Sequence, residues 1–387
     1  MIPLSEPSLG PREAARVQEC LAEGWVSAEG PWTGRFESAV AALHGPHMHA
    51  AACSSGTAAL QLALIALGLR PGELVIVPAL SFAATVNPII HLGAEPVILD
   101  VEEDSLGLSP EAVKNWLERE TLRRQGAVFE RRSGRRVFGL LPVHLYGLPC
   151  RIHDLAQLAL EFGLTLLEDN AEALGARARG RLTGTFGHAS ILSFNGNKTI
   201  TAGGGGMVLS ADEGVTARAA YWANQARRPG QPDPDDYGFN FRLSSLQAAL
   251  GLAQLERLDE LLAGRRAQHE AYRAGLASLG LGLLEGQAGD DPSWWLNIAQ
   301  GLGRREMEGL VADLAARGVQ VRRVFRPFDC WPLYSAYARM ECRTARQSYE
   351  NCLALPSSSQ LDAAGRAAVL DALASHLAAP LPVEAAS

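Results

Sequence analysis

Three short segments of the sequence carry side chains that could do chemistry together. Residues 54–58 (SSGTA) open an apolar helix with small side chains, and the free N–H groups of a helix's first turn favour a bound phosphate. Glu168 and Asp169 follow the apolar run LTLL, where a carboxylate could cap a helix or keep a heteroaromatic nitrogen protonated. Lys198 lies in the Gly- and Asn-rich segment 193–199 (SFNGNKT), where it could be solvated or, if desolvated, form a Schiff base.

Each segment alone has a plain structural explanation, but the ordered set of three suits one cofactor. Pyridoxal 5′-phosphate needs an anchor for its phosphate, an anion for its pyridine nitrogen and an amine for its aldehyde. A Walker loop is not expected, because no glycine lies at the required spacing before Lys198, and the four glycines at 203–206 do not spell GxGxxG. His47 and His49 have no carboxylate nearby in sequence, so we expect no metal site.

The elements that must position these segments alternate between strands and helices. Nearly continuous apolar runs, typical of parallel strands buried on both faces, occupy residues 74–78, 95–100, 137–143 and 164–169. The apolar run 58–69 predicts a buried helix, and Ser109 before Pro110 predicts the start of another. The alternation from about residue 50 to 210 therefore predicts an α/β fold with a parallel sheet covered by helices.

The pattern changes near residue 255. Ser244 and Gln247 form a possible capping box before a long helix. The further elements expected are that helix at 246–266, strands at 294–302 and 319–325, and a C-terminal helix at 363–377. We therefore expect a large cofactor-binding domain at 15–255 and a smaller α+β domain at 256–387, with residues 1–14 packed near the smaller one.

Composition excludes several classes of partner. The 387 residues carry a net charge of −7, and no basic block suggests nucleic acid as the main partner. Six scattered cysteines without a CxxC pair indicate reduced thiols in a cytoplasmic protein. The N-terminus lacks the features of a secretory signal, and the run 58–69 is too short to span a bilayer, so we expect no membrane association.

For two features, the sequence leaves two possible roles open. Six arginines surround a Ser133-Gly134 turn signal in residues 123–138, which could be a solvated hairpin or an element that faces a nucleotide diphosphate. The arginines at 131–136 and 322–326 are candidates for local cationic sites. His144, in PVHLYG, could touch substrate or cap a strand.

Longer motifs resemble one known family, the DegT/StrS-type nucleotide-sugar aminotransferases among the fold-type I pyridoxal enzymes. The resemblance covers nearly the whole chain and runs through GPWTGRFESAVAALHG (30–45), CSSGTAALQLAL, VPALSFAATVNPI, LGAEPVILDV, PVHLYG, LLEDNAEALGA, SFNGNKTITAGGGGM, YGFNFRLSSLQAALGLAQLERLD and CLALPSSSQL (352–361). It implies a mostly parallel seven-stranded sheet between helices, followed by a smaller C-terminal domain.

The resemblance also implies residue roles. Lys198 matches the lysine that binds the cofactor aldehyde, and Asp169 matches the partner of the pyridinium nitrogen. The remaining cofactor-binding positions implied are Phe82 and Ala171 on the two ring faces, Gly56, Thr57, Ala58 and Ser193 at the phosphate, and Glu172 near the phenolic oxygen. Asn240 matches a residue that reaches the phosphate from a neighbouring subunit, with Arg242 as a further candidate, so a homodimer with shared active sites is expected.

The activity implied is amino transfer. The motifs are most similar to members that aminate C4 of nucleotide-linked 4-keto-6-deoxy-N-acetylhexosamines of the UDP-bacillosamine type, with glutamate as the expected donor. Amino transfer at sugar C3 or to a cyclitol would use the same residues. A catalytically silent cofactor-binding regulator is the alternative from another class, and intact Lys198, Asp169 and Ser193 argue against it.

Overall fold

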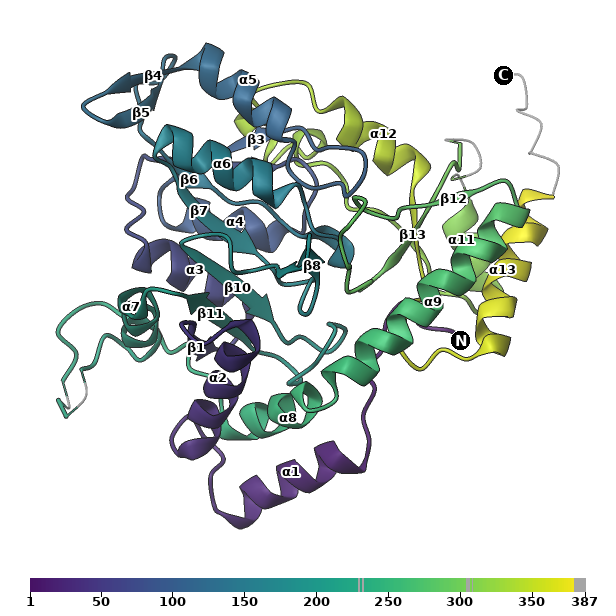
Figure 1. Ribbon diagram of the computed structural model, residues 1–387, viewed down its shortest axis with the longest axis horizontal. Coiled ribbons are helices and arrows are strands. Elements are labelled where there is room, and N and C mark those ends of the chain that lie inside the picture. The colour runs from purple at the N-terminus through teal and green to yellow at the C-terminus, as the bar shows by residue number, and fades with distance from the viewer. Residues whose placement is uncertain (229, 232, 304–306, 308, 379–387) are drawn as a thin grey trace.

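A seven-stranded sheet forms the centre of the computed structural model, which describes residues 1–378 except 229, 232, 304–306 and 308 (Figure 1). Its strands, in spatial order, are β1 (His49–Cys53), β11 (Gly206–Ser210), β10 (Ala189–Ser193), β7 (Thr165–Asp169), β6 (Val137–Leu140), β2 (Leu74–Pro78) and β3 (Glu95–Leu99). Only β11 runs against its neighbours. The sheet is therefore mostly parallel, as the sequence predicts.

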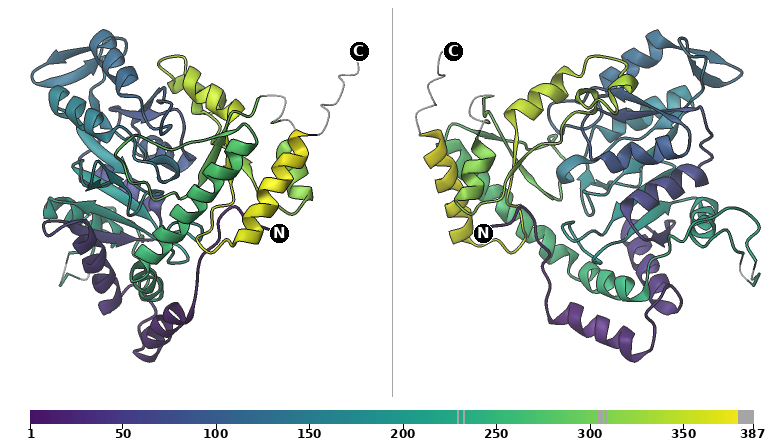
Figure 2. Two further views of the ribbon diagram at one scale, coloured as in Figure 1. Left: turned by 45° about the vertical axis from the view of Figure 1, so that its right-hand side comes forward. Right: turned by 180° about the vertical axis from the view of Figure 1, so that it is seen from behind.

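Helices cover both faces of this sheet (Figure 2). One face packs against α3 (Gly56–Ala66), α4 (Asn87–His91) and α7 (Glu213–Ala223). The other face packs against α5 (Pro110–Glu120), α6 (Ile152–Phe162), α2 (Pro31–His44) and α8 (Ser245–Leu255), with α1 (Pro11–Ala22) packed on α8. Neighbouring residues of one strand serve opposite cores, as Ile76 and Val77 do, which explains why the strands read as continuous apolar runs.

A second, four-stranded sheet is built from the C-terminal part of the chain. Its strands are β12 (Gly282–Leu283), β13 (Asn297–Gln300), β15 (Leu353–Leu355) and β14 (Arg322–Arg323), all antiparallel. A separate apolar cluster joins it to α9 (Leu258–Ser278), α11 (Leu310–Ala316) and α13 (Ala363–Leu377). Ile2, near the N-terminus, pairs with Val319 in this part of the chain.

The remaining elements are short. They are α12 (Arg343–Asn351), the pairs β4 (Thr121–Arg124) with β5 (Ala127–Glu130) and β8 (Arg177–Ala178) with β9 (Arg181–Leu182), and the 3-10 turns Ala83–Thr85, Leu145–Gly147, Phe328–Cys330 and Ser335–Tyr337. Within the described residues, no helix is both long and apolar enough to cross a membrane.

Several boundaries differ from the sequence-based expectation. The long helix expected at 246–266 is two helices, because the backbone leaves helical geometry at Arg257, whose guanidinium donates to Glu13 and Glu260. The strands expected at 294–302 and 319–325 are shorter, and Trp294 has a positive φ of 50° that no strand residue adopts. The capping box of Ser244 and Gln247 is confirmed.

The arginine-rich segment 123–138 also differs from expectation. The hairpin of β4 and β5 turns at Gln125 and Gly126, both with positive φ, whereas Ser133-Gly134 makes a later turn. Arg135 and Arg136 pair with Glu95 and Glu73, which lie at the amino ends of β3 and β2.

Candidate active site

A cavity of about 420 Å³ lies at the carboxyl ends of the parallel strands, where open α/β sheets bind ligands. The beginning of α3 and the ends of β7 and β10 form one side, and Trp295, Arg322 and Phe325 from the C-terminal part form another. The predicted site residues that line it are Gly56, Thr57, Phe82, Asp169, Ala171, Glu172, Ser193 and Lys198. The fold thus brings together the three segments that the sequence singles out.

The first turn of α3 is a candidate anion seat. Ser55 caps the helix by accepting the N–H of Ala58 at 3.0 Å. The N–H groups of Gly56 and Thr57 have no intrahelical carbonyl to bond, because they come before the first intrahelical hydrogen bond. A Cβ added to Gly56 would lie 2.9 Å from Cβ of Ser193, so the helix start and the end of β10 are in direct contact. Ala58 is buried behind the seat and is not part of the cavity lining.

Asp169 is a buried carboxylate at the end of β7. Its Oδ2 accepts the hydroxyl of Thr85 at 2.8 Å, and its Oδ1 accepts the N–H of Ala171 at 3.2 Å. Ser81 in turn hydrogen-bonds Thr85 at 2.7 Å. Burial raises the pKa of Asp169, and these two hydrogen bonds only partly offset it. The group therefore has the burial and fixed orientation that a partner for a cationic ring nitrogen requires.

Lys198 is held between a carboxylate and an aromatic ring. Its Nζ lies 3.1 Å from Oε1 of Glu172 and 4.0 Å from the ring centroid of Trp295. The other carboxylate oxygen of Glu172 accepts the N–H of Tyr146 at 2.9 Å, and this residue has a positive φ of 58°. The amine is thus mostly buried and fixed in direction, rather than a solvated loop lysine.

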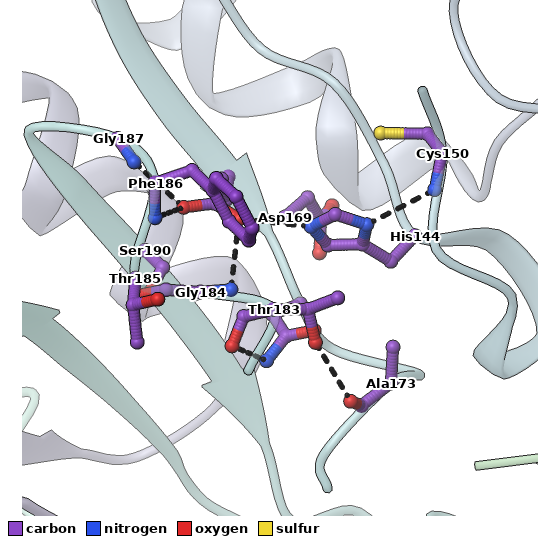
Figure 3. A network of polar contacts seen from close by, with 12 residues as sticks. His144, Cys150, Asp169, Ala173, Thr183, Gly184, Thr185, Phe186, Gly187 and Ser190 are labelled. Atoms are coloured by element: carbon purple, nitrogen blue, oxygen red, sulfur yellow. Dashed lines mark hydrogen bonds and ion pairs between the residues drawn. The ribbon is translucent and has the colours of Figure 1, made fainter. Parts of the chain in front are cut away.

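A buried polar network lies behind Asp169 (Figure 3). Glu168 is fully buried and accepts the N–H groups of Gly184, Phe186 and Gly187 as well as the ring of His144 at 3.0 Å. The other ring nitrogen of His144 accepts the N–H of Cys150, so its Nε2 carries the proton given to Glu168. His144 therefore has a structural role and does not touch the cavity.

The same network includes the buried side chain of Asn170. Its amide donates to the carbonyl of Thr183 at 3.3 Å and accepts the Thr183 hydroxyl at 2.8 Å. The strand end that carries Asp169 is thus bonded to the 183–187 loop through both of its neighbours in sequence.

Besides Ala58, two predicted residues lie outside the cavity of their own chain. Asn240 is exposed and bridges Asn224, and Arg242 pairs with Glu29. The arginine-rich hairpin lies at the opposite end of the strands from the cavity, so its arginines 123–136 do not line the cavity, and the alternative of a solvated hairpin holds. Arg322, in contrast, does line the cavity.

Sequence reasoning missed four residues that shape the site: Thr85, Tyr146, Trp295 and Phe325. The signal for Thr85 is weak, since it lies in the 3-10 turn Ala83–Thr85, well beyond the end of β2, and carries no motif of its own. Trp295 carries no local signal, because it comes from a strand flank about a hundred residues beyond Lys198. In the described part of the chain, no group of three or more His, Cys, Asp or Glu side chains could hold a metal ion.

Comparisons with known proteins agree with this geometry. The chain matches the model of the DegT/DnrJ/EryC1/StrS aminotransferase family over residues 7–374. A GDP-perosamine synthase of Vibrio cholerae is 36% identical over 354 residues, which cover 91% of this chain and 92% of the relative. The putative pyridoxal phosphate-dependent aminotransferase EpsN of Bacillus subtilis is 35% identical over 334 residues, covering 86% and 83%. The crystal structure of an aminotransferase, TlmJ from Streptoalloteichus hindustanus, is 28% identical, covers 98% of this chain and 99% of that chain, and superposes with a TM-score of 0.87.

Proposed function

The chain belongs to the DegT/DnrJ/EryC1/StrS aminotransferase family, as its motifs predict, and we propose that it transfers the amino group of glutamate to C4 of a nucleotide-linked 4-keto-6-deoxy sugar with pyridoxal phosphate as cofactor. One observation carries the proposal. The amine of Lys198, the buried carboxylate of Asp169 and the capped start of α3 face a single cavity.

The residues present fit pyridoxal phosphate. The seat formed by Gly56, Thr57 and Ser193 would hold the phosphate, since its helix start offers N–H donors and its tight contact leaves no room for a larger side chain. Asp169 would hold the ring nitrogen, and Phe82 and Ala171, which both line the cavity, would flank the ring. When bound, the cofactor supplies an aldehyde for an amine and a ring that takes up the electron pair left on carbon after proton loss.

Lys198 is the proposed acid and base. Its Nζ would bind the cofactor aldehyde at rest. Once freed, it would take the proton from Cα of the amino donor and deliver it to the carbon that had carried the cofactor aldehyde. In the second half of the reaction it would move a proton in the opposite sense at the sugar carbon. Glu172 directs this amine, because its carboxylate lies 3.1 Å from Nζ and is itself fixed by the Tyr146 N–H.

The nucleotide and the sugar are the open part of the proposal. The motifs favour a UDP-linked N-acetylhexosamine, whereas the relative from Vibrio cholerae is named GDP-perosamine synthase, which favours a GDP-linked sugar. A panel of 4-keto-6-deoxy sugars linked to UDP, GDP or dTDP separates these, with amination at C3 as an identifiable product.

We also propose a homodimer with shared active sites. Asn240 is exposed and bridges Asn224 just beyond the end of α7, at the base of a segment that projects from the body of the molecule (Figure 1). An exposed polar side chain at this position is available to contact the phosphate seat of a second copy.

The test is spectroscopic. The purified protein should bind pyridoxal phosphate with a yellow absorbance band, and glutamate alone should bleach that band as the amino group is transferred. A 4-keto nucleotide sugar should then restore it. Bound cofactor without bleaching by any amino donor would favour the silent cofactor-binding regulator instead.

A further inference from the structure

Trp295 touches the lysine loop in two independent ways. Its indole N–H donates to the carbonyl oxygen of Asn197 at 2.6 Å, and its ring face lies 4.0 Å from Nζ of Lys198. The side chain is buried, and the residue comes from the flank of β13 in the C-terminal part of the chain. The residue before Lys198 and the amine itself are thus held by one aromatic side chain.

Arg265, on α9, fixes Trp295 in turn. Its guanidinium donates to the carbonyls of Trp295 at 2.7 Å and Ser357 at 2.9 Å, and more weakly to that of Lys198 at 3.4 Å. The side chain is only 2% exposed. Within the described residues its hydrogen bonds go to carbonyl oxygens, and no carboxylate pairs with it. Burial lowers the pKa of Arg265 to about 10. At neutral pH the side chain is therefore a cation, and its hydrogen bonds to three carbonyl oxygens join α9 to Trp295 and to the lysine loop.

The lysine loop depends on such outside contacts. Residues 195–199 form turns without a helix or a strand, and Gly196 has open space around it. Within the loop, Lys198 N–H bonds the carbonyl of Asn195, and the Ser5 hydroxyl shares the Asn197 carbonyl with the indole. Reacting groups lose rate steeply when they are displaced by about 1 Å, so a loop of this kind needs external bonds to keep Nζ in place.

We propose that Trp295 is a positioning residue for Lys198, held in place by Arg265. Its N–H fixes the backbone of the lysine loop. Its ring face stabilises the protonated form of the freed amine, between proton transfers, by a cation–π interaction. The inference rests on the proposed amino-transfer function. It assigns the C-terminal part of the chain a direct share in placing the proton-carrying atom.

Three substitutions separate the two contacts. Trp295→Phe keeps a ring without the N–H, Trp295→His keeps an N–H with a smaller ring, and Trp295→Leu removes both. In the half-reaction with glutamate, we expect the maximal rate to fall by about 10- to 100-fold in Trp295→Leu, while the glutamate concentration for half-maximal rate changes little. Trp295→Phe and Trp295→His should lie between. Trp116→Phe, a buried tryptophan of α5 away from the cavity, is the matched control and should react normally.

A second readout needs no activity. In the cofactor-free full chain, amide hydrogen exchange of the peptide containing residues 195–199 should be faster in Trp295→Phe and Trp295→Leu than in the unaltered chain, and should be largely restored in Trp295→His. Trp116→Phe should leave it unchanged.

The outcomes are separable. Normal half-reaction rates in Trp295→Leu, or unchanged exchange in Trp295→Phe, would overturn the inference. A loss in Trp295→Leu that appears only as a higher glutamate requirement would also overturn it, since that pattern indicates a substrate contact. If the unaltered chain neither binds the cofactor nor transfers an amino group, the proposed function fails, and the exchange experiment alone decides whether Trp295 holds the loop.

Discussion

At the scale of single residues, Asp169 is a buried carboxylate whose charge a bound ligand would stabilise. Burial disfavours its charged form, and among the described residues the carboxylate accepts hydrogen bonds only from the Thr85 hydroxyl and the N–H of Ala171. A cationic ring nitrogen would offset that cost. Glu168, its neighbour, is also buried but has four N–H donors, so it is satisfied without a ligand.

The first prediction concerns Asp169→Asn. Because the folded-state pKa of Asp169 is raised, its ionised form destabilises the cofactor-free protein at neutral pH, and this penalty disappears as the pH falls through the folded-state pKa toward the unfolded value. The cofactor-free Asp169→Asn protein should therefore unfold at a higher temperature than the unaltered chain at pH 7, with a difference that shrinks in acid. With cofactor present, turnover should fall by about 100-fold or more.

The two halves of this prediction use different measurements, thermal unfolding from pH 4 to 8 and amino transfer at pH 7. A variant that is less stable at pH 7, or that turns over normally, contradicts the role assigned to Asp169. Lys114→Arg, on the exposed face of α5, serves as a control for both.

Single residues were predictable where the signal is local. Asp169 at a strand end and Lys198 in a Gly- and Asn-rich turn are readable in short windows of sequence. Thr85 and Trp295 were not, because each acts on a residue that lies more than eighty positions away in the chain, and only the folded chain brings them together. His144 shows the converse: the sequence left two roles open, and full burial against Glu168 decides between them.

At the scale of elements, the contact between the start of α3 and the end of β10 shapes the anion seat. Gly56→Ala should separate the two, because the added Cβ would lie 2.9 Å from Cβ of Ser193, which has no freedom to move away. We expect a loss of about 1–3 kcal/mol in the free energy of unfolding and weaker binding of pyridoxal phosphate. Denaturant unfolding and absorbance titration measure the two effects.

Gly34→Ala in α2 is the control, since a Cβ there meets no atom within 4 Å. It should be neutral or slightly stabilising, as a helix-interior glycine replaced by alanine usually is. Unchanged cofactor affinity in Gly56→Ala would argue that the phosphate binds elsewhere.

The existence of the elements was predictable, and their boundaries less so. β2 occupies the expected residues 74–78, because a continuous apolar run marks it. α13 occupies the expected 363–377, and Asp362 caps its start. The break between α8 and α9 was missed, since the apolar pattern continues through Arg257 and only the tertiary bonds of that side chain mark the break. The strand β14 is shorter than the strand expected at 319–325. Among the described residues of that stretch, Arg322 and Arg323 alone pair with β15.

At the scale of the whole molecule, the fold class and the family were predictable because motifs recur along nearly the entire chain. We propose the division into 15–255 and 256–387, supported by the separate apolar cluster of the C-terminal part and by Ile2, which pairs with it. The net charge of −7 is compatible with an anionic substrate, because Arg322 lines the cavity with Lys198.

The shared active site predicts complementation between inactive subunits. Lys198→Ala and Asn240→Asp should each be inactive or nearly so, the second because a new carboxylate would repel the phosphate. Subunits unfolded together and refolded as mixed dimers should regain up to about a quarter of normal activity, because half of the dimers are hybrids with one intact site each. No recovery, with hybrid dimers verified by differently tagged subunits, would contradict a shared site.

The most direct test of the central claim uses the fact that the chain contains only two lysines, Lys114 and Lys198. The protein is loaded with pyridoxal phosphate, reduced with borohydride and mapped by mass spectrometry after proteolysis. The account predicts a pyridoxyl group on Lys198, absent when glutamate is added before reduction, with Lys114 unlabelled. Labelling of Lys114 alone, or of neither lysine, would contradict it.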